Sequence, residues 1–385
     1  MVLTKQLKRN PLEIAEEIKT QLQSSPVSEI ESVEVAKPGF INFTLNNSSL
    51  IPAVNNILSL QRDYGKSEVG QGKEVMVEFG QPNTHKAFHV GHLKSAISGL
   101  SMVRLHENLG YRVIKANFYG DVGMQVAKTT WGFIHSEIPG DFDQMNVHAQ
   151  MKFIDSCYVL GAKNFKEDPL AEKEIRKINI DIYLEVDSHE VSIYKKLREI
   201  SLEHQTEVWK TLGIVYDREY PESEVYKDAI KLVNRYKDTI FQESEGAIIF
   251  DGKKVGLTNW VFLTSEGNPT YSSKDLALGY KKFEEYPNLF KSIVTTSVEI
   301  KDYFKVVIHV LNIINPITKG RYFHVPFGWM LRGGKKFSSR MGESVKGIDV
   351  IEEVRSVAYK KISELKEYPE NEKESIVQAV ADAGL

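Results

Sequence analysis

The pattern of hydrophobic and polar positions changes between a short amino-terminal segment and the rest of the chain. After Asn10-Pro11, a pair that favours helix starts, apolar residues recur at helical spacing. The apolar face of this helix consists of Leu12, Ala15, Ile18 and Leu22. Residues 30–45 then alternate as two strands around Pro38-Gly39, and a second helix is expected near 48–62. We therefore predict a small α+β domain over residues 1–65.

The remainder of the chain alternates strands and helices. Residues 75–79 form an apolar run, 92–109 a helical pattern closed by Gly110, and 111–118 a second strand. Strand, helix and strand at this spacing make a βαβ unit, which requires a parallel sheet. Further strands are expected at 247–250 and 292–296. The fold class that follows is α/β, with a parallel sheet.

The expected limits of this larger domain are residues 66 and 350. The polar, charged stretch at about 140–210 is mostly helical in pattern and is interpreted as an insertion. Residues 351–385 are predicted to be helical and to begin a separate carboxy-terminal region.

Composition narrows the functional classes. Hydrophobic residues make up 42% and charged residues 26% of the 385 positions, values typical of globular proteins. The 49 basic and 52 acidic residues nearly cancel, so attraction to nucleic acid would need a local patch. A single cysteine, Cys157, fits a reducing compartment, and the absence of a long apolar run predicts no membrane span. We expect a cytoplasmic protein.

The segment from Glu78 to His92, EFGQPNTHKAFHVGH, carries the most chemical information. It lies between the end of a predicted strand and the start of the next helix, where open α/β sheets bind ligands and helix termini attract anions. His89 and His92 flank Gly91, which lets a ligand approach the backbone. Imidazoles placed there can stabilise charge that develops on a phosphate, and Lys86 adds a positive charge.

Two other interpretations of this segment stay open. His85, His89 and His92 have the spacing of zinc ligands on one helix, but Pro82 and Gly91 disfavour a helix through all three. One histidine could also serve only to cap the helix. Neither a Walker A sequence nor GxGxxG is present.

A second basic segment lies much further along the chain, at residues 333–342, GGKKFSSRMG. Glycines give it mobility, and its cations and hydroxyls can reach a polyphosphate. Such short loops are commonly solvated surface. The segment therefore indicates a nucleotide site only in combination with the histidine motif.

Together these segments resemble class I aminoacyl-tRNA synthetases. His89-Val-Gly-His92 is similar to the HIGH signature, and Lys336-Phe-Ser-Ser-Arg340 to the KMSKS signature. The longer context resembles arginyl-tRNA synthetases, because 117–125 (NFYGDVGMQ), 220–223 (YPES) and 269–275 (PTYSSKD) follow that family's later motifs in order. Pro38-Gly-Phe-Ile-Asn-Phe43 is similar to the end of its additional amino-terminal domain.

The resemblance implies that the larger domain is a Rossmann-like, nucleotide-binding catalytic domain. It also implies an arginine–tRNA ligase that activates L-arginine with ATP, accompanied by Mg²⁺, and transfers it to the 3′ end of tRNA(Arg). Catalytic roles then fall to His89, His92 and Lys336. The implied ATP-binding residues are Lys86, His89, Gly91, His92, Lys335, Ser338, Ser339 and Arg340. The implied arginine-binding residues are Glu78, Asn83, Tyr271, Asp275 and Glu299. Asp121 is implied either to bind substrate or to order its turn. No metal-ligating residue is expected, and we expect a monomer that does not bind membranes.

The chain also departs from the family. Val298 and Glu299 stand around a position where relatives carry a glutamine that holds arginine, and Phe337 replaces a methionine. We expect the chain to lack part of the amino-terminal additional domain and nearly all of the helical anticodon-binding domain. Alternatives are a related adenylate-forming enzyme for another amino acid or acceptor, a non-catalytic tRNA-binding paralogue and, least favoured, a zinc enzyme.

Overall fold

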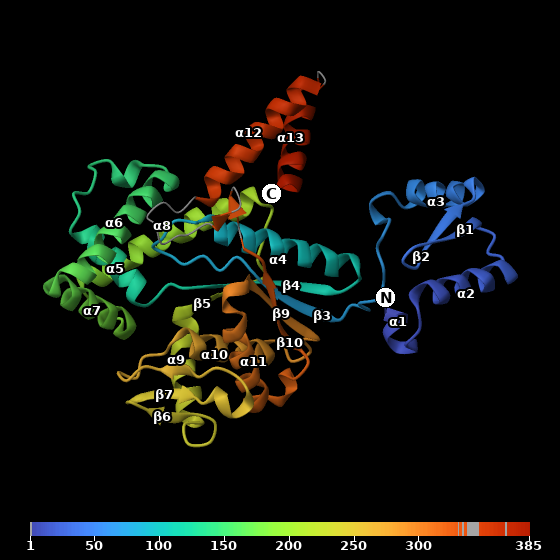
Figure 1. Cartoon of the computed structure of the whole chain (residues 1–385). Coiled ribbons are helices and arrows are strands. Elements are labelled where there is room, and N and C mark those ends of the chain that lie inside the picture. Colours follow the sequence, from blue (N-terminus) through green and yellow to red (C-terminus); the bar gives the residue numbers. More distant parts are fainter. Residues whose placement is uncertain (1, 330, 333–334, 337–345, 366–367) are drawn as a thin grey trace. The chain divides into compact units, whose positions relative to one another are not determined.

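The computed structural model describes residues 2–329, 331–332, 335–336, 346–365 and 368–385 (Figure 1). Its contacts divide the chain into two units, Met1–Ser67 and Glu68–Leu385, and each is described by itself.

The first unit contains helices around a hairpin. Asn10 caps its main helix by accepting a hydrogen bond from Leu12 N at 2.9 Å, and this helix buries Ile14 and Ala15. The hairpin strands pair antiparallel, with Val33 opposite Phe43. The elements are α1 (Val2–Leu7), α2 (Pro11–Ser24), β1 (Ile30–Ala36), β2 (Phe40–Leu45), α3 (Asn47–Leu60) and the 3₁₀ turn η1 (Gln61–Asp63).

A five-stranded parallel sheet forms the centre of the second unit (Figure 1). Its spatial order is β10-β9-β3-β4-β5, and every neighbouring pair runs parallel. The strands are β3 (Glu74–Glu78), β4 (Arg112–Tyr119), β5 (Arg218–Pro221), β9 (Lys291–Ser297) and β10 (Tyr322–Phe327). This sheet, covered by helices, confirms the predicted α/β fold.

Alternation along the strands separates two cores on the two faces of the sheet. Val75 and Val77 of β3 belong to the core under α4 (Val90–Asn108), whereas Met76 belongs to the opposite core. That opposite core includes Phe304 and other side chains of α11 (Lys301–Ile314). A strand that is apolar on both faces is typical of a buried parallel sheet, which is why residues 75–79 are a continuous apolar run.

Helices connect β4 to β5, and those after the first helix correspond to the stretch of about 140–210 that is predicted as an insertion. The connecting elements are α5 (Met124–Ile134), the turn η2 (Phe142–Gln144), α6 (Val147–Glu167), α7 (Pro169–Leu184) and α8 (His189–Thr211). Gly132 and Gly161 allow α5 and α6 to approach closely, because a Cβ at either would lie 2.0 Å from a backbone oxygen of the facing helix. Two apolar clusters stabilise this region.

The remaining elements complete the second unit. A small antiparallel sheet has the order β6-β7-β8, and two short strands, β11 and β12, pair with each other. The bounds are α9 (Glu222–Arg235), β6 (Gln242–Ser244), β7 (Ala247–Phe250), η3 (Gly252–Val255), β8 (Trp260–Leu263), α10 (Tyr271–Glu285), η4 (Val298–Ile300), η5 (Pro316–Thr318), β11 (Leu331–Arg332), β12 (Lys335–Lys336), α12 (Gly347–Leu365) and α13 (Glu370–Gly384). Within the described ranges, no helix has the length and apolar character that crossing a bilayer would require.

The strand order reverses between β3 and β9, since chain connections proceed outward from this pair in opposite directions. Ligands of open α/β sheets bind beside the carboxyl ends of the strands at such a switch point. Glu78 ends β3 there, and the loop that follows leads directly into α4.

Candidate active site

Two stacked imidazoles form the amino-terminal cap of α4. His89 Nδ1 accepts a hydrogen bond from Gly91 N at 3.1 Å, and His89 N donates to His92 Nδ1 at 3.3 Å. The ring centroids lie 3.6 Å apart. The helix therefore begins at Val90 rather than at His92 as predicted, because the histidines themselves satisfy the open backbone groups of its first turn.

This arrangement determines where each ring carries its proton. Burial, with a smaller contribution from Lys86, lowers the pKa of His89 to about 4. Burial and the neighbouring His89 hold the pKa of His92 well below 6.5. Both rings are therefore neutral at pH 7, and since each Nδ1 accepts a hydrogen bond, each Nε2 carries the hydrogen. The site presents two N–H donors beside a helix amino terminus, which suits an anion.

The insertion contacts the loop that precedes these histidines. Asp155 of α6 accepts a hydrogen bond from Ala87 N at 3.2 Å, and Lys86 Nζ lies 5.1 Å from the ring centre of Tyr158. The Asp155 charge partly opposes the fall in the pKa of His89. Lys86 thus has a defined position close to the pair, and its role in phosphate binding stays a prediction.

His85 belongs to the structural framework of this loop. It is fully buried, its Nε2 donates to Tyr194 O at 3.1 Å, and its backbone has a φ of 60°. Burial lowers its pKa to about 3. Among the described residues, no three histidine, cysteine or acidic side chains converge on a common metal position. The spacing of His85, His89 and His92 therefore does not translate into a shared site.

The segment that contains the predicted basic loop starts and ends beside the histidine pair. Lys94 Nζ donates to Trp329 O at 3.3 Å, His89 forms a backbone bridge with Lys346, and Gly347 N donates to Phe88 O at 2.9 Å. Lys335 and Lys336 form β12, and only their backbone is described. Ser338, Ser339 and Arg340 lie outside the described residues.

Two of the predicted arginine-binding carboxylates occupy an acidic cluster next to β3. Glu78 is only 2% exposed; its oxygens accept hydrogen bonds from Gln81 Nε2 at 3.0 Å and from Lys282 Nζ. Asp275 accepts a hydrogen bond from the Tyr303 hydroxyl. Burial and the Glu78 charge raise the pKa of Asp275 to about 7. The cluster therefore holds more negative charge than one lysine neutralises, which suits a cation.

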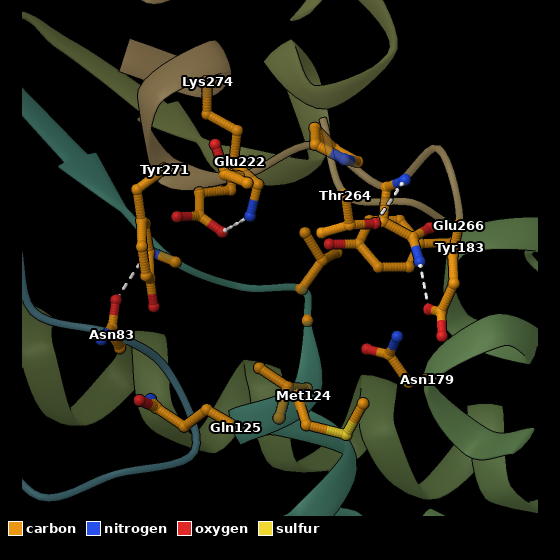
Figure 2. Close-up of a pocket in the computed structure, with 17 residues that line it drawn as sticks. Asn83, Met124, Gln125, Asn179, Tyr183, Glu222, Thr264, Glu266, Tyr271 and Lys274 are labelled. Atoms are coloured by element: carbon orange, nitrogen blue, oxygen red, sulfur yellow. Dashed lines mark hydrogen bonds and ion pairs between the residues drawn. The ribbon is translucent and has the colours of Figure 1, made fainter. Parts of the chain in front are cut away.

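A cavity of about 390 Å³ lies in the second unit beside the first turn of α10, the helix that also carries Asp275 (Figure 2). Figure 2 shows Lys274 and Glu222 joined on one side of it, with Asn179 and Tyr183 of α7 on the other. Among its described lining residues, Asn83 and Tyr271 come from the predicted arginine-binding set. Asn83 Oδ1 accepts a hydrogen bond from Gly120 N at 3.1 Å, so this side chain also holds the 117–125 segment in place.

Sequence reasoning did not include Glu222 and Lys274 in the site. Both are almost completely buried, and Lys274 Nζ lies 2.6 Å from Glu222 Oε2. Burial alone would lower the pKa of Lys274, but the Glu222 carboxylate outweighs it and raises that pKa. The missed signal is positional: Glu222 directly follows β5, and the carboxyl ends of parallel strands lie at one edge of the sheet.

Glu299 occupies a different setting from the other predicted arginine-binding residues. It lies in η4 at the end of β9, with an exposed side chain, and its backbone N–H donates to Ser297 Oγ at 3.4 Å. The described lining of the cavity does not include it.

Family models match almost the whole chain. Residues 53–384 match the model of the catalytic domain of class I tRNA synthetases (R), and residues 1–45 match the arginyl-tRNA synthetase amino-terminal domain. The arginine–tRNA ligase of Lactococcus lactis subsp. lactis (strain IL1403) is 28% identical over 97% of this chain and 64% of its own. The Treponema denticola arginine–tRNA ligase is 27% identical over 94% and 61%.

Solved structures agree in fold. Thermus thermophilus arginyl-tRNA synthetase superposes with a TM-score of 0.70 at 22% identity, over 99% of this chain and 67% of its own. The Plasmodium falciparum arginyl-tRNA synthetase gives 0.65 at 21%, over 98% and 64%. The chain thus spans about 64% of the length of the curated Lactococcus relative. Since the catalytic-domain model covers most of it, the chain belongs to the arginyl-tRNA synthetase family of class I tRNA synthetases.

Proposed function

We propose that this chain is the catalytic portion of an arginine–tRNA ligase. The observation that carries the proposal is that two places suited to ligands of opposite charge lie near the carboxyl end of β3. Neutral imidazoles offer N–H donors at the start of α4, and acidic side chains gather beside α10. ATP offers the anion and arginine the cation that these two places suit.

In the first proposed step, the carboxylate of arginine attacks the α-phosphorus of ATP. The bond between the α- and β-phosphates breaks, pyrophosphate leaves with the electron pair, and arginyl-adenylate forms. The Nε2–H groups of His89 and His92 donate hydrogen bonds to the α-phosphate oxygens as negative charge accumulates on them. The step needs no proton transfer, so positioning and electrostatic stabilisation supply the catalysis.

Cationic residues would hold the polyphosphate. We propose that Lys86 and the basic residues of 335–340, namely Lys335, Lys336 and Arg340 with Ser338 and Ser339, contact it, and that Gly91 lets it approach the backbone. The anchoring of both ends of that segment at the start of α4 supports this. Mg²⁺ would arrive with ATP and neutralise its charge.

Arginine would bind with its guanidinium near the acidic cluster. Planar, bidentate acceptors suit a guanidinium, and Asp275 keeps part of its surface exposed beside Tyr271. Glu78 is already paired on both oxygens, so we assign it the role of shaping the field around Asp275. Asn83 and Tyr271 would contact the substrate from the cavity, and Glu299 stays a predicted contact.

In the second proposed step, a ribose hydroxyl at the 3′ end of tRNA(Arg) attacks the carbonyl carbon of the adenylate. AMP leaves, the hydroxyl proton is released, and arginine becomes esterified to the tRNA. We also propose that the protein acts as a cytoplasmic monomer, which light scattering of the purified chain would test.

ATP–pyrophosphate exchange tests this function. The assay would contain tRNA, because the family resemblance implies that adenylate formation needs it, and each of the twenty amino acids in turn. Arginine-dependent exchange supports the proposal. Exchange with a different amino acid would indicate a paralogue with other specificity, and no exchange together with no arginine binding would contradict an arginine-activating role.

A further inference from the structure

The insertion contributes a cation to a hydrogen-bond network next to residues that line the 390 Å³ cavity. Arg198 of α8 donates from Nε to Asp121 Oδ2 at 2.9 Å. The Asp121 side chain is completely buried, whereas that of Arg198 is 27% exposed. Asp121 belongs to the 117–125 segment between β4 and α5, so this contact joins the insertion to the catalytic sheet.

Asp121, held by Arg198, also forms hydrogen bonds with the start of α9. Its Oδ1 accepts a hydrogen bond from Ser223 N at 2.8 Å, and its Oδ2 accepts another from Ser223 Oγ at 2.7 Å. With the bond from Arg198, two oxygens accept three hydrogen bonds. Such a carboxylate is well suited to fix its neighbours and poorly suited to bind a substrate cation in addition.

Ser223 adjoins the carboxylate that faces the cavity. Glu222 is the first residue of α9, and its side chain both lines the cavity and pairs with Lys274 at 2.6 Å. Because the peptide N–H of Ser223 is held by Asp121, the backbone of Glu222 is held with it. The direction of the Glu222 side chain therefore depends on contacts that reach back to α8.

We propose that Arg198 is a positioning residue for arginine binding: through Asp121 and Ser223 it holds Glu222 in the orientation that faces the bound amino acid. This inference rests on the proposed function. It makes the insertion part of the arginine site, although Arg198 itself contacts no substrate.

Loss of the Arg198 cation has a local consequence. Asp121 would keep a buried carboxylate with its charge unpaired, which is costly, and it would relax toward water. Space for that relaxation exists, because Arg198 and Ser223 line a second cavity of about 350 Å³. We therefore expect Glu222 to lose its fixed orientation while the sheet and the histidine pair stay intact.

The test measures L-arginine binding and, separately, ATP binding by calorimetry on the full chain. Arg198→Met should raise the Kd for arginine roughly tenfold, about the value of one charge-assisted hydrogen bond, and leave the Kd for ATP unchanged. Arg198→Lys should recover most of the affinity. Lys196→Met is the matched control on the same helix, because Lys196 pairs at the surface with Asp143, and it should bind arginine like the wild type.

The outcomes separate this inference from the function on which it rests. Wild-type protein that binds no arginine contradicts both. Wild-type and Arg198→Met proteins with equal affinity for arginine contradict the inference alone, as does an equal weakening of ATP and arginine binding. If Arg198→Met does not fold, Ser223→Ala decides: it removes the hydroxyl bond to Asp121 but keeps the peptide N–H bond. Arginine binding should then weaken by a smaller factor than in Arg198→Met, about two- to fivefold, with ATP binding unaffected.

Discussion

The histidine pair at the start of α4 and the acidic cluster beside α10 suit ligands of opposite charge, and they do so by different means. Each imidazole is engaged through Nδ1 by a backbone N–H, which leaves Nε2 as a donor. The carboxylates instead receive side-chain partners: Lys282 pairs with Glu78 and Lys274 with Glu222. The third carboxylate, Asp275, accepts a hydrogen bond from the neutral Tyr303 hydroxyl, so its charge is not offset by such a pair. The anion site is built locally from a few consecutive residues. The cation site depends on contacts between residues far apart in the chain.

The largest expected effect concerns the local site. His92→Ala removes one Nε2–H donor and the acceptor of His89 N, so arginine-dependent pyrophosphate exchange should fall roughly 100- to 1,000-fold while the Kd for ATP changes little. His106→Ala, further along the same helix, is the matched control and should keep near-normal activity. Near-normal exchange by His92→Ala would exclude a transition-state role for this histidine.

Substitution in the acidic cluster should have a smaller and different effect. Asp275→Asn keeps the shape but removes the charge, and the Kd for arginine should rise roughly 10- to 100-fold, with ATP affinity retained. Asp302→Asn, which changes a surface carboxylate paired with Lys305, should bind arginine normally. The comparison between the two sites fails if Asp275→Asn weakens ATP binding and leaves arginine binding intact.

The two sites should also respond differently to pH. With a pKa of about 7, Asp275 is mostly protonated at pH 6 and mostly ionised at pH 8. Guanidinium binding favours the ionised form, so arginine affinity should rise about tenfold over this range and a proton should be released on binding. The histidines stay neutral throughout, so ATP affinity should show no matching change from them. Calorimetry in buffers of different ionisation enthalpy measures the proton count; affinity that is flat with pH contradicts the assignment.

The histidine cap makes a further prediction for stability. The pKa of His89 is lower in the folded protein than in the unfolded chain, so its stabilising effect is complete above about pH 6.5 and is lost as the pH falls through about 4. His89→Asn keeps a good capping residue without a titrating ring. Relative to the wild type it should gain up to roughly 3 kcal/mol of unfolding free energy between pH 6.5 and 4. If the unfolding free energies of the two proteins, measured by denaturant titration, fall in parallel between pH 6.5 and 4, His89 is not buried as described.

Much of the fold could be predicted from the sequence where the pattern is local. The apolar run of β3, the helical spacing of α4 and the alternation of β1 and β2 depend on neighbouring residues, and these elements were placed within a few positions. The sequence pattern predicts the start of α4 two residues late because histidine is not among the usual capping residues. The strand order could not be predicted, because β9 joins β3 from more than two hundred positions away.

The same distinction applies to the site. His89, His92 and Lys86 lie within one segment, and their proximity follows from a short loop before a helix. The sequence pattern does not indicate Glu222 as a site residue because β5, the strand before it, is only four residues long. The strand that pairs with β5 is determined by the tertiary fold. The cationic partners of Glu78 and Asp121, which are Lys282 and Arg198, are 204 and 77 positions distant, so no local pattern indicates them.

A crystal structure of the chain with a non-hydrolysable sulfamoyl mimic of arginyl-adenylate tests the central claim most directly. The account predicts that the sulfamoyl oxygens lie within hydrogen-bond distance of Nε2 of His89 and His92, and that the guanidinium lies against Asp275 with Glu222 close by. A mimic bound with its guanidinium away from these carboxylates, or with its sulfamoyl group away from the histidines, would contradict it.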